Sequence, residues 1–306
     1  MASTNDKEAG HPQTAEFVSA VKDSYPGVDK LTPIGGRPGI GKYIRQLWQR
    51  RHFIWRQSRG RVVTGNDDAK LGPLWLVLRP TLDAAFYWII FGLLLQFDRG
   101  MDNFVAFVII GVFMFQMTSS ALGTGSKVIA SSRSLIRAFK FPRMALPLGE
   151  ALYDLLQRGP AFLMMFLIIM AIPPHELPEW SWLLFPIILL IHVVLNFGIT
   201  LLVARLAVVF PDLSKVIPFL TRLLMYGSGV IFPITRFTTR YPTLEAVIEL
   251  NPIYTVLLMY REILIDGTVP AVEHWLVLCG WVVVLFVAGF LVFWQGEESY
   301  GRERNV

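Results

Sequence analysis

Six apolar blocks, each about long enough to cross a lipid bilayer, constrain this chain more than any other feature of its sequence. An α-helix needs about 20 residues to span roughly 30 Å of hydrocarbon, and backbone groups in lipid must pair within the helix. Hydrophobic residues make up 54% of the chain and charged residues only 17%. We therefore expect an all-α integral membrane protein with six transmembrane helices, at 74–97, 104–122, 145–172, 182–209, 216–234 and 276–294.

The basic residues predict the orientation of these spans. With both termini in the cytosol, nineteen Lys and Arg residues from 37 onward lie on the cytosolic side, and the outer segments hold four: Arg99, Arg236, Arg240 and Arg261. Cytosolic loops of membrane proteins carry such an excess of basic residues. We therefore expect a multi-pass protein of the plasma membrane with both termini in the cytosol.

Two polar ends flank the spans. Residues 1–39 are rich in Gly, Pro and charged side chains, which predicts a disordered cytosolic tail. Residues 297–306 form a cytosolic C-terminal tail, in which we expect the acidic pair Glu297 and Glu298 to be solvated.

The segment 40–70 predicts an amphipathic interface helix followed by a linker. Within 40–59, apolar and aromatic residues recur at steps of three and four, and six Lys and Arg residues fill much of the remainder. Such a helix is typical of the surface of an anionic leaflet, with its Trp rings at headgroup depth. A basic arm for nucleic acid is the alternative, and the membrane span that comes so soon after it disfavours it.

A second basic segment, 127–143, joins the second and third spans. It carries five Lys and Arg residues, no acid, and apolar residues between the charges. This pattern predicts a short amphipathic element on the cytosolic membrane face, where contact with anionic lipid is one role open to it.

Motifs for chemistry within the chain are weak. The stretch 36–42, GRPGIGK, fits seven positions of a phosphate-binding loop, but Tyr43 comes next where a Ser or Thr must reach magnesium, and no hydrophobic strand precedes it. The five histidines show no metal-ligand spacing. We expect no bound cofactor or metal in this chain, and no enzymatic activity of its own.

The forty residues between the fifth and sixth spans are too short to cross the membrane twice. Helical character at 243–249 and 254–266 is separated by Asn251 and Pro252, and the second stretch is strongly apolar. We expect a half-inserted helical hairpin on the outer side, because irregular backbone at membrane depth must be covered by protein or water. A surface loop with two helices is the alternative.

Charges inside the spans are the strongest candidates for a substrate path. Arg79 and Asp83, like Asp154 and Arg158, are four residues apart, so each pair can either neutralise itself along one helix or line a polar route. A four-residue step also keeps Tyr87 and Phe91 on the face of Asp83. The predicted path residues are Arg79, Asp83, Tyr87, Phe91, Asp154, Arg158, Arg222 and Tyr226.

Five short motifs together resemble the permease subunits of type-2 ABC exporters, and within them the Wzm-type group that exports polysaccharides or teichoic acids. The motifs are LGPLW with Arg79-Pro80, the FPR that ends the basic segment, VVFPDL at 208–213, GVIFPI at 229–234, and NP with YRE at 251–262. The resemblance makes 71–296 the transmembrane domain of such an exporter. Where many members have an Arg-Asp pair after the fourth span, this chain has Pro211-Asp212, so that arginine's role does not carry over.

The resemblance also implies partners. The segment 127–143 would be the coupling helix that docks on a separate ATPase subunit, which binds ATP and magnesium. The contact residues would be Lys127, Ser131, Arg133, Leu135, Arg137, Phe139, Lys140, Phe141 and Arg143. The permease would act as a homodimer and pass a polyprenyl-linked glycan between its two copies, and overall similarity favours a cell-wall galactan.

Two other functions remain open from the sequence. The same architecture could export a drug or a small lipid. A channel or secondary transporter that works without ATP is the third possibility, motivated by the charges inside the spans.

Overall fold

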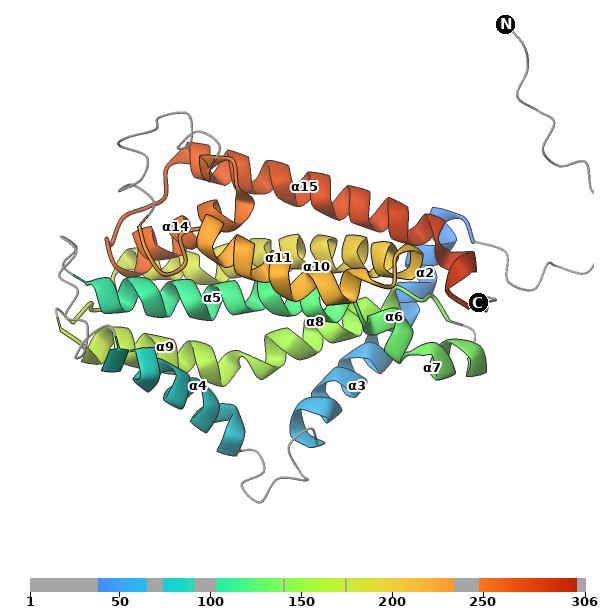
Figure 1. Cartoon of the computed structure of the whole chain (residues 1–306), viewed down its shortest axis with the longest axis horizontal. Helices are drawn as coiled ribbons and strands as arrows, with labels where there is room; N and C mark the ends of the chain where they lie inside the picture. Colours follow the sequence, from blue (N-terminus) through green and yellow to red (C-terminus); the bar gives the residue numbers. More distant parts are fainter. Residues whose placement is uncertain are drawn as a thin grey trace, which may run out of the picture. The chain divides into compact units, whose positions relative to one another are not determined.

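The computed structural model describes residues 38–64, 74–87, 89–90, 103–139, 141–173, 175–233 and 248–301, which apart from Pro38 belong to one compact unit, 39–306. Within these residues the regular structure is entirely helical (Figure 1). The elements are α2 Ile40–Gln49, α3 Arg51–Thr64, α4 Trp75–Tyr87, α5 Phe104–Gly125, α6 Val128–Ser131, α7 Arg133–Ala138, α8 Ala145–Gln157, α9 Gly159–Ala171, η4 Trp180–Leu184, α10 Phe185–Val209, α11 Leu213–Gly227, α14 Pro252–Leu264, α15 Val272–Gln295 and η5 Glu297–Gly301.

Four stretches are long and apolar enough to cross a bilayer: α5, α8 with α9, η4 with α10, and α15. They match the second, third, fourth and sixth predicted spans. The fifth predicted span overlaps α11, a helix of 15 residues that begins at Leu213 and ends at Gly227. The first contains α4, and residues 91–97 lie outside the described residues. The all-helical membrane class is confirmed for the described part, and the count of six spans stays a prediction.

The third span is interrupted in its middle. Arg158 forms a turn between α8 and α9, and Pro160 occupies the first turn of α9. Proline has no backbone N–H and disfavours helical geometry in the residue before it, so the sequence Arg158-Gly159-Pro160 explains the break. The first half, α8, packs on α3, and the second half, α9, packs on α4 (Figure 1).

Helices α5 and α10 lie at the centre of the packing. Helix α10 contacts α5, α8, α14 and α15, and the main apolar core is built from α5, α9, α10 and α14. Helix α15 lies against α10 but buries only three of its residues, Leu278, Gly289 and Phe293. A membrane helix with an exposed apolar surface suits contact with lipid or with another apolar chain.

The predicted helix 40–59 is two helices. Helix α2 ends at Gln49, Arg50 stands at the break, and α3 continues to Thr64. Their buried side chains are Tyr43, Ile54 and Ser58, whereas the rings of Trp48, Phe53 and Trp55 are exposed. The amphipathic pattern is strong in α2 and weak in α3, and the place of these helices at a membrane surface stays a prediction.

One arm of the predicted outer hairpin is a buried helix. Helix α14 begins at Pro252, and the Asn251 side chain accepts a hydrogen bond from the Ile253 N–H at 3.0 Å, as a helix N-cap does. Nine of its residues are buried against α5, α10, α15 and η4. The other arm, 243–249, lies mostly outside the described residues, so the hairpin as a whole stays a prediction.

Candidate functional site

The ion pair Asp154–Arg158 is formed within the third span. Arg158 donates from Nε to Asp154 Oδ2 at 2.8 Å and from Nη2 to Oδ1 at 2.9 Å. The Ser120 hydroxyl also donates to Oδ1 at 2.7 Å, and Arg158 Nη2 donates to the Gln116 carbonyl at 2.9 Å. Both oxygens of the carboxylate are therefore already engaged, which favours the interpretation that the pair neutralises itself.

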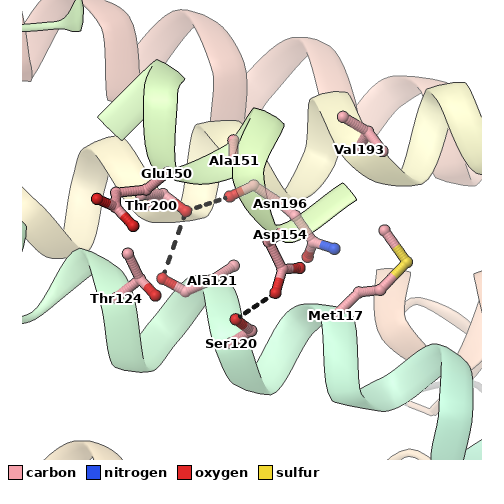
Figure 2. A pocket seen from close by; sticks show the side chains of 10 residues that line it. All are labelled: Met117, Ser120, Ala121, Thr124, Glu150, Ala151, Asp154, Val193, Asn196 and Thr200. Atoms are coloured by element: carbon pink, nitrogen blue, oxygen red, sulfur yellow. Dashed lines mark hydrogen bonds between the residues drawn. The ribbon is translucent and has the colours of Figure 1, made fainter. Parts of the chain in front are cut away.

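A small cavity adjoins this pair, between α5, α8 and α10 (Figure 2). Its volume is about 30 Å³, which is enough room for a water molecule. Six of its ten lining residues are polar or charged, which is unusual inside a membrane span. The lining consists of Met117, Ser120, Ala121, Thr124, Glu150, Ala151, Asp154, Val193, Asn196 and Thr200.

Asn196 has unmet hydrogen-bonding capacity in this cavity. Its side chain is 7% exposed, and neither the amide nitrogen nor the amide oxygen has a partner. Figure 2 shows the amide directed into the same space as the Asp154 carboxylate. Since a buried amide left without partners costs about 1–3 kcal/mol, the site suits a guest that both donates and accepts, such as water or a hydroxyl group.

The charges around the cavity cancel in pairs. Glu150 forms an ion pair with Arg61 of α3, and Asp154 forms one with Arg158. The cavity therefore has no excess charge that would favour an ion, and no group of three His, Cys, Asp or Glu in the described parts of the chain could hold a metal. Sequence reasoning missed Glu150, Ser120, Thr124 and Thr200. The available signals were four-residue steps within one helix: Glu150 to Asp154 on α8, Ser120 to Thr124 on α5, and Asn196 to Thr200 on α10.

We expect the single variants Asp154→Asn and Arg158→Gln to lower the stability of the protein by about 2–3 kcal/mol each, because each leaves a charge in the span without its partner. The double variant should recover most of that loss, since it is neutral and keeps hydrogen-bonding side chains. Thermal unfolding in detergent measures all three. A double variant as unstable as the sum of the singles would contradict the self-neutralising interpretation.

The other predicted path residues are only partly described. Asp83 is half-buried on α4, whereas Phe91 and the side chains of Arg79 and Tyr87 lie outside the described residues. The stripe on the first span therefore stays a prediction. On α11, Arg222 is exposed and Tyr226 is 54% exposed, with the Tyr226 ring stacked on Phe232.

The basic segment folds as two short helices rather than one. Val128, Ile129 and Ile136 of α6 and α7 are buried in an apolar cluster with residues of α2, α10 and α15. The exposed predicted contact residues are Lys127, Ser131, Arg133, Arg137 and Phe139, while Leu135, Phe141 and Arg143 are at least partly buried and Lys140 lies outside the described residues. The element thus has an apolar inner face and a basic outer face.

Arg261, expected in an outer loop, is instead 5% exposed inside the protein. Its Nη2 atom donates to the carbonyl oxygens of Gly229 and Val230, each at 3.0 Å, and of Phe107 at 3.3 Å. Its guanidinium carbon lies 3.4 Å from the centre of the Phe107 ring. No carboxylate in the described parts of the chain forms an ion pair with it.

The carbonyls of Gly229 and Val230 that Arg261 binds lie just after the end of α11. Gly229 has φ of 61°, a left-handed conformation that glycine adopts without strain, and it turns the chain away from the helix. Carbonyls at a helix C-terminus carry partial negative charge, so a buried cation is favourable there. Sequence reasoning did not connect Gly229 with Arg261.

No model of a protein family matches the chain. Curated proteins do match it over most of its length. It is 24% identical over 261 residues to an O-antigen export system permease protein RfbA of Myxococcus xanthus, covering 85% of this chain and 98% of that protein. An RfbA of Klebsiella pneumoniae is 25% identical over 76% of the chain and 90% of its own length. The polysialic acid transport protein KpsM of Escherichia coli is 24% identical over 75% of the chain and 88% of its own length.

The chain is a homologue of these export permeases. The matches confirm the resemblance to Wzm-type permeases of type-2 ABC exporters. Together with the four apolar spans they indicate a multi-pass protein of the plasma membrane that serves as a transport subunit.

Proposed function

We propose that this chain is the membrane permease of an ABC transporter that exports a lipid-linked polysaccharide across the plasma membrane, driven by ATP hydrolysis in a separate subunit. The observation that carries the proposal is the similarity to three differently sourced polysaccharide-export permeases over three quarters of the chain or more. The absence of a usable phosphate loop in the sequence supports a separate source of energy, because Tyr43 stands at the magnesium-binding position.

The basic segment is the proposed docking surface for the ATPase subunit. Its apolar side chains anchor α6 and α7 to the ends of the transmembrane helices, and Phe139 at the end of α7 is 64% exposed. An exposed aromatic ring among basic side chains is typical of a protein contact. ATP and magnesium would then bind to the partner and not to this chain.

The proposed route for the glycan lies between two copies of the permease. On α11, Val216, Phe219, Leu223 and Tyr226 are exposed on one helical face, with Arg222 at its edge. Contact with lipid would explain the exposed aliphatic side chains on this face. An exposed arginine beside a tyrosine fits better with a hydrated path for sugars. We propose that Arg79, Asp83, Tyr87 and Phe91 of the first span line the same path. The ion pair of Asp154 and Arg158 would stabilise the helices next to it.

The proposed cargo is a glycan on a polyprenyl diphosphate, and a cell-wall galactan is the first one to test. Depletion of the protein should leave lipid-linked glycan on the cytosolic side and reduce glycan at the cell surface. Radiolabelled glycan, extracted with lipid and separated from surface polymer, measures both pools. Normal surface glycan after depletion would overturn the proposal. Loss of drug efflux alone would favour the small-molecule exporter, and transport in vesicles without an ATPase would favour a channel or secondary transporter.

Reversing charge on the docking surface should weaken assembly with the ATPase subunit. We expect the double variant Arg133→Glu/Arg137→Glu to lower co-purification of the ATPase by about tenfold or more, since two reversed charges at an interface cost at least about 1.4 kcal/mol. Quantitative co-purification in detergent measures this. Lys215→Glu is the matched control, because Lys215 is an exposed basic residue in the first turn of α11. Unchanged co-purification of the double variant would remove this surface as the docking site.

A further inference from the structure

Glu297 does not lie in a solvated tail, contrary to the expectation from its sequence neighbourhood. Its side chain is 7% exposed, and it belongs to η5, directly after α15. It meets two segments that are far away in the sequence, α2 and the turn between α7 and α8. We call the four residues that meet there, Tyr43, Arg143, Met144 and Glu297, the cytosolic junction.

Three hydrogen bonds connect the members of the junction. The Tyr43 hydroxyl donates to Glu297 Oε2 at 2.8 Å and accepts from the Met144 N–H at 3.1 Å. The Arg143 N–H donates to Glu297 Oε1 at 2.9 Å. Each of these polar atoms thus has a partner on another segment, and Tyr43 is fully buried. Buried networks with every member satisfied hold their segments in one arrangement.

The electrostatics of the junction agree with this bonding. Burial raises the pKa of Glu297, and the hydrogen bonds from the Arg143 N–H and the Tyr43 hydroxyl oppose that rise. Burial, followed by the negative charge of Glu297, raises the pKa of Tyr43. The Tyr43 hydroxyl therefore keeps its proton and can act as the donor to the carboxylate.

The C-terminal side of the junction is fixed to the transmembrane helices. Tyr300 donates from its hydroxyl to the Phe293 carbonyl of α15 at 2.9 Å, and Arg205 of α10 donates to the Ser299 hydroxyl at 2.7 Å. A Cβ on Gly296 would lie 2.7 Å from the Tyr300 hydroxyl oxygen, so η5 is folded tightly against the end of α15. A force on η5 is therefore passed to α15 and α10.

We propose that Glu297 is a positioning residue of the transporter: it ties the turn after the docking surface to α2 and, through η5, to α15 and α10. A displacement of α6 and α7 by a bound partner would then move the start of α8 and the end of α15 together. This inference rests on the proposed function in that it takes α6 and α7 to be the surface on which the ATPase acts.

Amide hydrogen exchange on the purified full-length permease tests the junction without any partner. In Tyr43→Phe and in Glu297→Gln, peptides that contain the Arg143 and Met144 amides should exchange about tenfold faster or more than in the natural protein. The double variant should exchange little faster than the more affected single one, because both changes break the same network. Glu298→Gln, a change in the exposed neighbour, is the matched control and should match the natural protein. Unchanged exchange at 141–148, or equal acceleration throughout α5, would overturn the proposal.

A second measurement separates positioning from stability. In complexes with the ATPase subunit, Glu297→Gln should leave co-purification and ATP hydrolysis near natural levels but lower glycan exported per ATP hydrolysed by several-fold. Equal losses in hydrolysis and export would contradict a positioning role. If no ATPase subunit co-purifies with the natural permease, the proposed function fails, while the exchange experiment still decides whether Glu297 holds the turn.

Discussion

Replacing Arg261 by Met should destabilise the protein by about 3–5 kcal/mol, the cost typical of removing one side of a buried charged interaction. The variant keeps a long side chain but leaves the carbonyls of Gly229, Val230 and Phe107 without their donor. A buried carbonyl without a partner costs about 1–3 kcal/mol, and lipid offers no replacement donor. We expect the thermal midpoint in detergent to fall by about 5–15 °C, or expression to fail.

Two further variants make this expectation specific. Arg261→Lys keeps the charge but has a single nitrogen, so it should lose about half as much stability as Arg261→Met. Arg222→Met is the matched control, because it removes an exposed guanidinium from α11 itself. Amides of 228–233 should exchange faster in Arg261→Met than in the control. Equal thermal midpoints for Arg261→Met and the natural protein would show that the hydrogen bonds from Arg261 to the three carbonyls do not stabilise the fold.

The variant Gly198→Leu should lower stability by about 3 kcal/mol or more, because α10 and α15 meet backbone to backbone at this residue. A Cβ on Gly198 would lie 2.7 Å from the Leu285 carbonyl carbon and 2.8 Å from the Phe286 nitrogen. A Cβ on Gly289 would lie 2.6 Å from the Gly198 oxygen, so both glycines are needed at the crossing. Backbone atoms cannot rotate aside as a side chain does, and overpacking commonly costs about 1–3 kcal/mol even where side chains yield.

The matched control for this variant is Gly280→Leu. Gly280 lies on α15 too, but nothing lies within 4 Å of the position of its Cβ. Replacing glycine in a helix with leucine there should be neutral or stabilising by up to about 1 kcal/mol. Thermal unfolding of both variants in the same detergent measures the difference. A Gly198→Leu protein as stable as Gly280→Leu would show that the two helices can separate at no cost.

The sequence predicted the features that depend on local composition. The apolar runs located α5, α10 and α15 closely, and the alternation of basic and apolar residues found the outward and inward faces of α6 and α7. The Asn251-Pro252 pair marked the start of α14 to within a few residues. Each of these signals lies within a window of about twenty residues, which is the scale on which hydrophobic periodicity is informative.

The features that sequence reasoning missed depend on contacts between distant segments. Tyr43 and Glu297 are 254 residues apart, and Glu297 looked solvated because its sequence neighbours are polar. Arg261 was predicted to be an outer basic residue. Its partners are backbone carbonyls, and because every residue has one, no sequence pattern identifies them. Glu150 was overlooked beside Asp154, although both residues lie on α8 and line the same cavity. Such partners cannot be predicted from composition, because they depend on how α2, α8, α10 and α15 pack together.

The break in the third span divides that span between two neighbours. Before the break α8 packs with α3, and after it α9 packs with α4. Arg158 stands at the break and is bound to the Gln116 carbonyl of α5, so the point of flexure is pinned to the central helix. We expect a tilt of α8 to pivot near this contact with α5. We therefore expect the two halves of this span to be able to tilt independently, because each half packs on a different neighbouring helix.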